Sequence, residues 1–195
     1  MNSALDYVRK HLTESRDALA AADTSEFSAT LIKIADALTA ALRAGGKVML
    51  CGNGGSAADA QHIATELMGR YESEREPVAA LALTTDTSAL TAISNDYGFE
   101  HVFARQVRGL GRKGDVLIGL STSGKSPNVL AALDAAREMG IVTIGFTGKK
   151  GGDLSSCCDI VLNAPSDRTP VIQQIHMTAA HIVCGLVERA VGAKR

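Results

Sequence analysis

The sequence predicts an α/β fold in which five parallel strands form a doubly wound, flavodoxin-like sheet flanked by additional N- and C-terminal helices. The expected strands are short, continuous apolar runs, and each is separated from the next by a segment with helical spacing. Strands of this kind are buried on both faces, as in parallel sheets covered by helices. With 195 residues, 46% of them hydrophobic and 21% charged, the chain is expected to form one domain, residues 1–195.

Residues 1–44 are expected to form a pair of helices ahead of an α/β core at residues 45–195. Apolar side chains recur there at helical spacings: Leu5, Val8, Leu12 and Leu19, then Phe27, Leu31, Ile34, Leu38 and Leu42. Asp23 and Thr24 provide a cap between the two helices, and Gly45-Gly46 ends the second.

The core alternates strands with helices. The expected strands are residues 47–51, 78–83, 115–120, 141–146 and 159–162. The expected helices are residues 56–71, 88–94, 99–109, 127–139 and 170–191. Ser126 and Pro127 form a good helix start, and Thr169 is expected to cap the long final helix. Right-handed crossovers then place helices on both faces of the sheet.

Composition excludes several function classes. Lys and Arg number 20 against 21 Asp and Glu, and seven aromatic residues (Phe 4, Tyr 3, Trp 0) leave little for base stacking, so nucleic acid is not the expected partner. The four cysteines form no CxxC pair and suggest neither a disulfide framework nor a structural zinc site. The charged N-terminus and the lack of an apolar run of about 18 residues predict a soluble, cytoplasmic protein.

Segments rich in Gly, Ser and Thr follow four of the strands, at residues 52–56, 84–87, 121–126 and 147–152. Ligands of doubly wound sheets bind beyond the carboxyl ends of the strands. Each segment alone is best explained as a turn or a helix cap. Together they favour a phosphorylated or polyhydroxyl ligand, held by hydroxyls and by free backbone N–H groups at helix starts.

Two nucleotide motifs fit poorly. Residues 52–57 match a loose G-x-G-x-x-A, but the first acidic candidate, Asp86, lies 34 residues beyond Gly52 instead of about 20. Gly124-Lys125-Ser126 resembles the end of a P-loop without the upstream glycine at a suitable position. Neither a nicotinamide cofactor nor nucleotide hydrolysis is therefore favoured.

Titratable residues lie close to the expected phosphate pocket. His62 and Glu66 are four residues apart on the helix after the glycine loop and so share one face, although a solvated helix face would look the same. Gln173, His176 and His181 lie on the final helix. The two histidines are five residues apart and do not share a face, so one of them is expected to serve only packing or the surface.

Four segments together resemble the phosphoheptose isomerase (sedoheptulose 7-phosphate isomerase) family of sugar-isomerase (SIS) domains. They are residues 51–62 (CGNGGSAADAQH), 91–98 (TAISNDYG), 121–126 (STSGKS) and 172–176 (IQQIH). The resemblance covers nearly the whole chain, including the N-terminal helical pair, and the joint occurrence of four motifs is specific.

The resemblance implies an aldose–ketose isomerase that interconverts sedoheptulose 7-phosphate and D-glycero-D-manno-heptose 7-phosphate, the first step toward activated heptose for lipopolysaccharide or capsule. It also implies a cytoplasmic homotetramer with one zinc ion per subunit. The implied zinc ligands are His62, Glu66, Gln173 and His181, of which Glu66 and His181 match the acid/base pair. The implied substrate contacts are Asn53, Gly54, Gly55, Glu66, Asn95, Asp96, Ser121, Thr122, Ser123, Ser126 and Gln173.

These residue types suit the reaction. A carboxylate such as Glu66 can take a proton from one carbon and return it to the neighbouring carbon through an enediol(ate). His181 can protonate the oxygens and help to open the sugar ring. Zinc would polarise the carbonyl, and His, Glu and a carboxamide oxygen are suitable ligands.

The spacing on the final helix suggests a site between subunits. Gln173 and His181 are eight residues apart, which is about 12 Å along a helix and about 80° around its axis. On one straight helix, the two side chains could reach the same metal ion only if both were fully extended. We therefore hypothesise that the final helix contributes to more than one pocket.

One segment departs from the family pattern, and two alternatives stay open. Some members have Asp-Arg directly before the Ile-Gln of the last motif, where this chain has Pro170-Val171, with Asp167-Arg168 earlier. A non-catalytic SIS protein could bind a sugar phosphate or a replication-initiator partner, but the initiator-associating relative lacks the glutamate found here as Glu66. An isomerase for another phosphosugar would share the phosphate loop.

Overall fold

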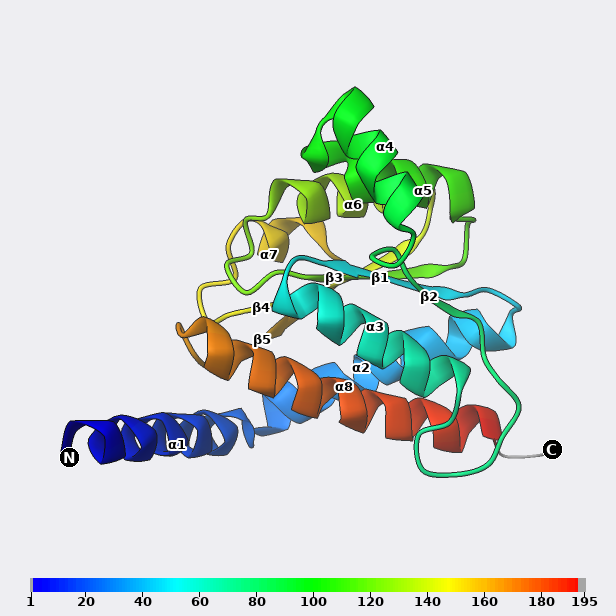
Figure 1. The fold of residues 1–195 in the computed structure, drawn as a ribbon. Helices are drawn as coiled ribbons and strands as arrows, with labels where there is room; N and C mark the ends of the chain where they lie inside the picture. Colours follow the sequence, from blue (N-terminus) through cyan, green and yellow to red (C-terminus); the bar gives the residue numbers. More distant parts are fainter. Residues whose placement is uncertain (1, 193–195) are drawn as a thin grey trace.

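Five parallel strands form one sheet in the order β2–β1–β3–β4–β5 in the computed structural model, which describes residues 2–192 (Figure 1). The strands are β1 (Val48–Gly52), β2 (Ala80–Ala82), β3 (Val116–Leu120), β4 (Val142–Thr147) and β5 (Ile160–Asn163). β1 and β3 are buried along their whole length. This order and the parallel pairing confirm the predicted flavodoxin-like α/β class.

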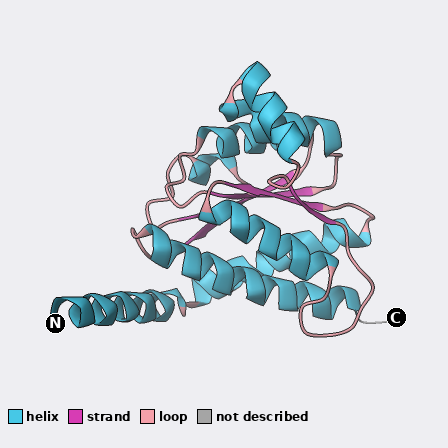
Figure 2. Cartoon of the chain, viewed as in Figure 1, coloured by secondary structure: helices cyan, strands magenta, loops and turns pink. Residues whose placement is uncertain are grey.

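Helices cover both faces of the sheet, which forms the middle layer (Figure 2). α2 (Ser25–Arg43), α3 (Gly55–Met68) and α8 (Thr169–Gly192) lie on one face. α4 (Thr87–Tyr97), the 3₁₀ turn η1 (Phe99–His101), α5 (Val102–Leu110), α6 (Pro127–Glu138) and α7 (Leu154–Cys157) lie on the other. Neighbouring residues of β1 illustrate the two cores, since Leu50 packs with the first set and Met49 with the second.

α1 (Asn2–Ala22) projects from the body of the molecule (Figure 1). Its second half is anchored: Ala18 and Ala22 share a small core with Val171 and Ile172 at the start of α8, and Arg168 pairs with Glu14 and lies 3.4 Å from His11. Further along, Tyr7 and Leu12 are exposed. Thr24 separates α1 from α2, and its Oγ1 accepts the N–H of Phe27 at 3.2 Å, as predicted for a cap.

The structure differs from the sequence prediction at several element boundaries. β2 is shorter than residues 78–83 because this edge strand pairs only with residues 48–50 of β1. α3 ends at Met68 instead of Tyr71, and the chain from residue 69 to 79 forms no helix or strand. The short helix α7 was not predicted, and Thr169 is the first residue of α8 instead of its cap.

α8 is the one helix in residues 2–192 that has the length and composition to cross a membrane. Half of its apolar window is buried inside the protein, where Val183 and Val187 join the core beside α2 and α3. Its apolar character is therefore explained by its place in the core.

Candidate functional site

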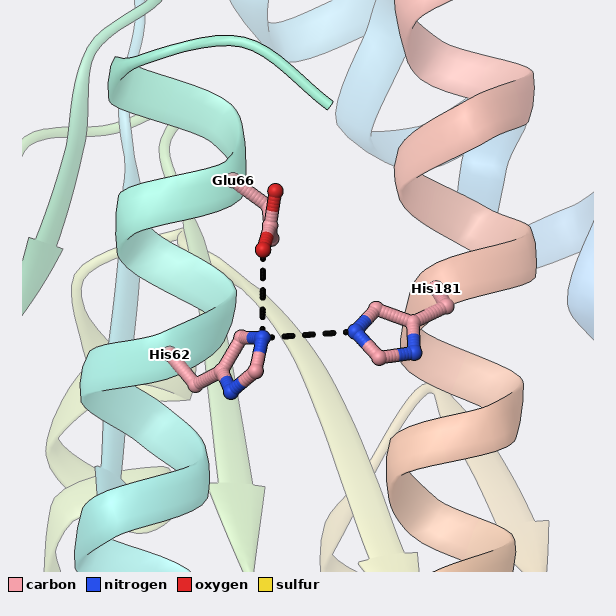
Figure 3. Close-up of side chains that lie close together, drawn as sticks. All are labelled: His62, Glu66 and His181. Atoms are coloured by element: carbon pink, nitrogen blue, oxygen red, sulfur yellow. Dashed lines mark hydrogen bonds and ion pairs between the residues drawn. The ribbon is translucent and has the colours of Figure 1, made fainter. Parts of the chain in front are cut away.

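Two helices bring three ionisable side chains together, which we call the ionisable cluster: His62 and Glu66 of α3 and His181 of α8 (Figure 3). The Nε2 atom of His62 lies 3.1 Å from Oε1 of Glu66 and 3.3 Å from Nε2 of His181. The two imidazole rings meet edge to face, with centroids 5.2 Å apart. The predicted shared face of His62 and Glu66 therefore exists, and it is directed at α8.

Small side chains allow α3 and α8 to lie close together. Ala60 and Ala64 of α3 and Ala180 and Cys184 of α8 are all buried in the same core. The cluster lies at the edge of this packed face, where the side chain of His62 is 50% exposed and that of Glu66 is 21% exposed. The three groups are thus held by a rigid core but remain open to solvent on one side.

The donor atoms of the ionisable cluster fit a metal ion. Ligands at 2.0–2.1 Å from a tetrahedral zinc are about 3.3–3.4 Å apart. The two distances at His62 are 3.1 and 3.3 Å, and all three donor atoms lie within 4.8 Å of one another. Two imidazoles and one carboxylate leave a fourth tetrahedral position for a further ligand. Imidazole also suits copper, iron and nickel, so the set alone does not specify the metal.

Three of the four cysteines are unsuitable as ligands or nucleophiles. Burial raises the pKa of the Cys51, Cys158 and Cys184 thiols to about 12, which keeps them protonated at neutral pH. Cys184 lies on α8 close to the ionisable cluster but faces the core.

A second group of polar side chains, the strand-end cluster, gathers beyond β1 and β3. It comprises Ser121, Ser123, Ser126, Asn53 and Asn128. Ser121 Oγ is 2.9 Å from Ser126 Oγ and 3.5 Å from Ser123 Oγ. Asn53 and Asn128 exchange two amide hydrogen bonds of 2.8 Å, which tie the glycine loop to the start of α6. Gly52 and Leu120 are sheet partners, so the two loops leave adjacent strand ends.

Gly124 closes the serine loop against the loop after β4. It has a positive φ of 66°, and a Cβ there would lie 2.8 Å from Thr147 Oγ1 and still closer to the Gly151 carbonyl. Only glycine fits this approach. The backbone N–H groups and hydroxyls of residues 121–126 are thereby concentrated at the carboxyl end of β3, as predicted from the sequence.

Gln173 lies at the glycine loop. Its carboxamide packs directly on Gly55, where a Cβ would lie 3.0 Å from Gln173 Cδ. His181 meets His62 farther along the same two helices, so α3 and α8 run in the same direction. Three of the four implied zinc ligands therefore come together within one chain, and for these three no second subunit is needed.

The remaining predicted residues have other surroundings. His176 is fully buried, with Nε2 3.1 Å from the Thr147 carbonyl, and burial lowers its pKa to about 4. It is the packing histidine that the five-residue spacing predicted. Asn95 and Asp96 hydrogen-bond to each other on the exposed side of α4. Within residues 2–192 they form no hydrogen bond or ion pair with either cluster.

Sequence reasoning missed two contacts at these sites. The Tyr71 ring stacks on His181, with centroids 5.6 Å apart and planes at 20°, and Asn128 holds Asn53. Both come from segments that the motifs do not include. Tyr71 and His181 also line a shallow cavity of about 240 Å³ beside the ionisable cluster.

Comparison with known proteins identifies first a class and then a family. The SIS domain family model matches residues 10–148, which places the chain in the SIS class of α/β domains. The chain is 58% identical over 192 residues to "Phosphoheptose isomerase" of Bradyrhizobium sp. (strain ORS 278), covering 97% of each chain. It is 53% identical to the Burkholderia pseudomallei (strain 1710b) protein of that name, over 100% of this chain and 99% of the relative.

Solved structures agree. The phosphoheptose isomerase from Neisseria gonorrhoeae has a TM-score of 0.90 at 45% identity, covering 95% of this chain and 99% of that one. The Francisella tularensis enzyme has a TM-score of 0.92 at 36% identity, covering 95% and 98%. The chain belongs to the phosphoheptose isomerase family, and it is an isomerase with the fold expected from its motifs.

Proposed function

We propose that this protein converts sedoheptulose 7-phosphate to D-glycero-D-manno-heptose 7-phosphate and so supplies heptose for lipopolysaccharide or capsule. The observation that carries the proposal is the ionisable cluster, which places Glu66, His62 and His181 within 4.8 Å of one another in a chain that is 58% identical to a phosphoheptose isomerase. A carboxylate beside two imidazoles can move protons between carbon and oxygen, which is what an aldose–ketose isomerase requires.

Glu66 and His181 divide the proton transfers. Glu66 removes a proton from C1 of the ketose, forming a 1,2-enediol, and returns it to C2. His181 carries a proton from the C1 oxygen to the C2 oxygen, so the hydroxyl becomes a carbonyl at C1 and the carbonyl becomes a hydroxyl at C2. Both groups act best when they are held within hydrogen-bond reach of the substrate, and the packing of α3 on α8 supplies that rigidity.

His62, Glu66 and His181 would hold a zinc ion, with the Gln173 carboxamide as the proposed fourth ligand. When bound, the ion would polarise the carbonyl and stabilise negative charge on the enediolate. The role of Glu66 as a base then requires its carboxylate to be free of the ion for part of each turnover.

The strand-end cluster would bind the phosphate. Ser121, Thr122, Ser123 and Ser126 offer hydroxyls and backbone N–H groups, and Asn53, Gly54 and Gly55 open α3 beside them. Asn95 and Asp96 on α4 would contact the sugar hydroxyls. Because Gln173 lies on Gly55, it would contact the substrate between the phosphate and the ionisable cluster.

The proposed assembly is a cytoplasmic homotetramer with active sites at subunit interfaces. Two features support an interface. The side chain of His62 is half exposed in the single chain, and α1 projects with apolar side chains such as Tyr7 and Leu12 exposed. Light scattering after size exclusion would measure the assembly, and a stable active monomer would contradict this part of the proposal.

Incubation of the purified protein with sedoheptulose 7-phosphate, with detection of the aldose product, tests the function. We expect turnover that is lost after chelation and restored by zinc. A panel of other ketose phosphates run alongside would distinguish an isomerase for a different phosphosugar. Binding of the heptose phosphate without turnover, in the presence of zinc, would instead indicate a non-catalytic SIS protein.

A further inference from the structure

Glu188 on α8 is a buried carboxylate that the proposed reaction does not use. Its side chain is 5% exposed, yet it accepts three consecutive backbone N–H groups, from Tyr71 at 2.8 Å, Glu72 at 2.9 Å and Ser73 at 2.7 Å. Burial alone would raise the pKa of Glu188, but these donors and the charge of Arg75 outweigh it and lower the pKa below its ordinary value. The carboxylate is thus an anion that gathers the loop after α3 onto α8.

Arg75 extends this anchor to the end of α3. Its side chain is 3% exposed, and its Nε lies 3.3 Å from Glu188 Oε2. The guanidinium also donates to the backbone carbonyl of Glu66 at 2.8 Å and to that of Glu76 at 3.0 Å. One buried ion pair therefore connects α8 with the backbone of a residue in the ionisable cluster.

The loop held by this ion pair carries Tyr71, whose ring lies on His181. The imidazole consequently has Tyr71 stacked at 5.6 Å and His62 edge to face at 5.2 Å. Tyr71 also packs against Gly185, where a Cβ would lie 3.3 Å from Tyr71 Cε1. Glycine is unfavourable inside a helix, and the close approach of this ring explains its presence in α8.

We infer that Glu188 and Arg75 are positioning residues, which hold Tyr71 on His181 and thereby fix the imidazole toward His62 and Glu66. The inference builds on the proposed metal and proton-transfer role of the ionisable cluster. A partly exposed histidine can otherwise take up several rotamers, and each misaligned rotamer removes one donor from the cluster. Groups that orient a metal ligand typically change metal affinity by 10- to 100-fold when they are removed.

The ring of His181 gives a readout that needs neither metal nor substrate. Protein labelled on histidine is compared by NMR as wild type, Glu188→Gln, Tyr71→Ala and Tyr71→Phe. We expect the ring-current shift of the His181 protons in the wild type and in Tyr71→Phe, and its loss in Glu188→Gln and Tyr71→Ala. Gly185→Ala should also reduce it, because the new methyl displaces the tyrosine ring while favouring the helix.

Co²⁺ binding to the same proteins measures the consequence for the cluster. Glu188→Gln and Tyr71→Ala should weaken Co²⁺ binding by about 10- to 100-fold, and Tyr71→Phe should bind like the wild type. Asp115→Asn is the matched control. Asp115 is another buried carboxylate, which accepts Lys47 N–H at 3.0 Å and Arg112 N–H at 2.8 Å, but it lies at the amino end of the central strand β3 and has no contact with the ionisable cluster among the described hydrogen bonds and ion pairs. The Co²⁺ affinity of the Asp115→Asn variant should stay within about twofold of the wild type.

Three results would overturn the inference: a His181 ring-current shift that is retained in Glu188→Gln, unchanged Co²⁺ affinity in Tyr71→Ala, or equal weakening in Asp115→Asn. If Glu188→Gln does not fold, Arg75→Gln decides, because it breaks the ion pair and leaves the Glu188 carboxylate in place; a retained ring-current shift in this variant would also contradict the inference. A wild type that shows the ring shift and binds Co²⁺ but does not isomerise sedoheptulose 7-phosphate would contradict the proposed function and support the positioning role.

Discussion

The two polar clusters of this protein are built in opposite ways. In the ionisable cluster, side chains from two helices meet at a partly exposed edge, and their spacing along each helix sets the geometry. In the strand-end cluster, backbone turns after two strands bring serines and asparagines together, and those side chains already hydrogen-bond to one another. The first region can gain or lose protons, whereas the second offers neutral donors and acceptors.

We propose that this difference separates chemistry from binding. Proton transfer needs groups whose charge changes, and phosphate binding needs donors that stay in place whatever the pH. If the division is correct, substitutions in one cluster should leave the other property intact.

The largest effect is expected at Glu66. Glu66→Gln keeps the shape of the side chain but removes the base, so kcat should fall by about 10²- to 10⁴-fold with little change in KM. Steady-state kinetics measures both constants. Glu74→Gln is the control, because it makes the same change of carboxylate to carboxamide at an exposed position in a loop. A raised KM at unchanged kcat would make Glu66 a binding residue and remove the contrast between the clusters.

His176 sharpens the contrast, because it shares α8 with His181 but belongs to neither cluster. The pKa of His176 is about 4 in the folded protein and 6.5 when the side chain is exposed, so as the pH is lowered the unfolded chain becomes protonated before the folded protein does. The free energy of unfolding should thus fall by up to about 3 kcal/mol as pH drops from 6.5 to 4. Urea unfolding across this range should show the loss in the wild type and in exposed His101→Asn, and His176→Leu should remove it.

Ser121 tests the binding half of the division. Ser121→Ala removes a buried hydroxyl from the strand-end cluster and should weaken phosphate-ester binding by about 1–3 kcal/mol, a rise in KM of roughly 5- to 150-fold. Co²⁺ affinity should not change. Ser156→Ala, which removes an exposed hydroxyl on α7, provides the reference. Equal losses in Co²⁺ and substrate affinity would show that the two clusters are not independent.

The smallest effect is expected at Asn128. Asn128→Ala breaks both hydrogen bonds to Asn53, but Asn53 is only partly buried and can bind water instead, so the loss should be about 1 kcal/mol. For a domain of this size, the unfolding temperature should fall by about 2–4 °C. Calorimetry would measure this fall, with Asn163→Ala, an exposed substitution at the end of β5, as the reference. An unchanged unfolding temperature would mean that the amide pair does not stabilise the glycine loop.

The sequence was sufficient for the fold because its local signals agree. Continuous apolar runs and a helix start at Pro127 predicted strands and helices that the structure confirms. Besides the ends of α3 and α8, the errors are at β2, whose length depends on how many residues of β1 pair with it, and at α7, a single turn too short for periodicity to indicate.

The site was only partly predictable. His62 and Glu66 followed from four-residue spacing, but the arrival of His181 depends on the packing of two distant helices, and only the family resemblance suggested it. Tyr71, Arg75 and Glu188 were missed because their contacts are non-local. Two signals in the sequence did mark them: Glu188 is a charge within an apolar helical stripe, and Gly185 is a glycine inside a helix.

His62 and His181 are 119 residues apart in the sequence, so the ionisable cluster can form only after most of the chain has been synthesised. A ribosome completes all five strands before it begins α8, so the nascent chain can pair its sheet and form the strand-end cluster while the second histidine is still unmade. Chains interrupted before α8 would keep the strand-end cluster, His62 and Glu66 but lack His181, so the ionisable cluster is completed only late in synthesis.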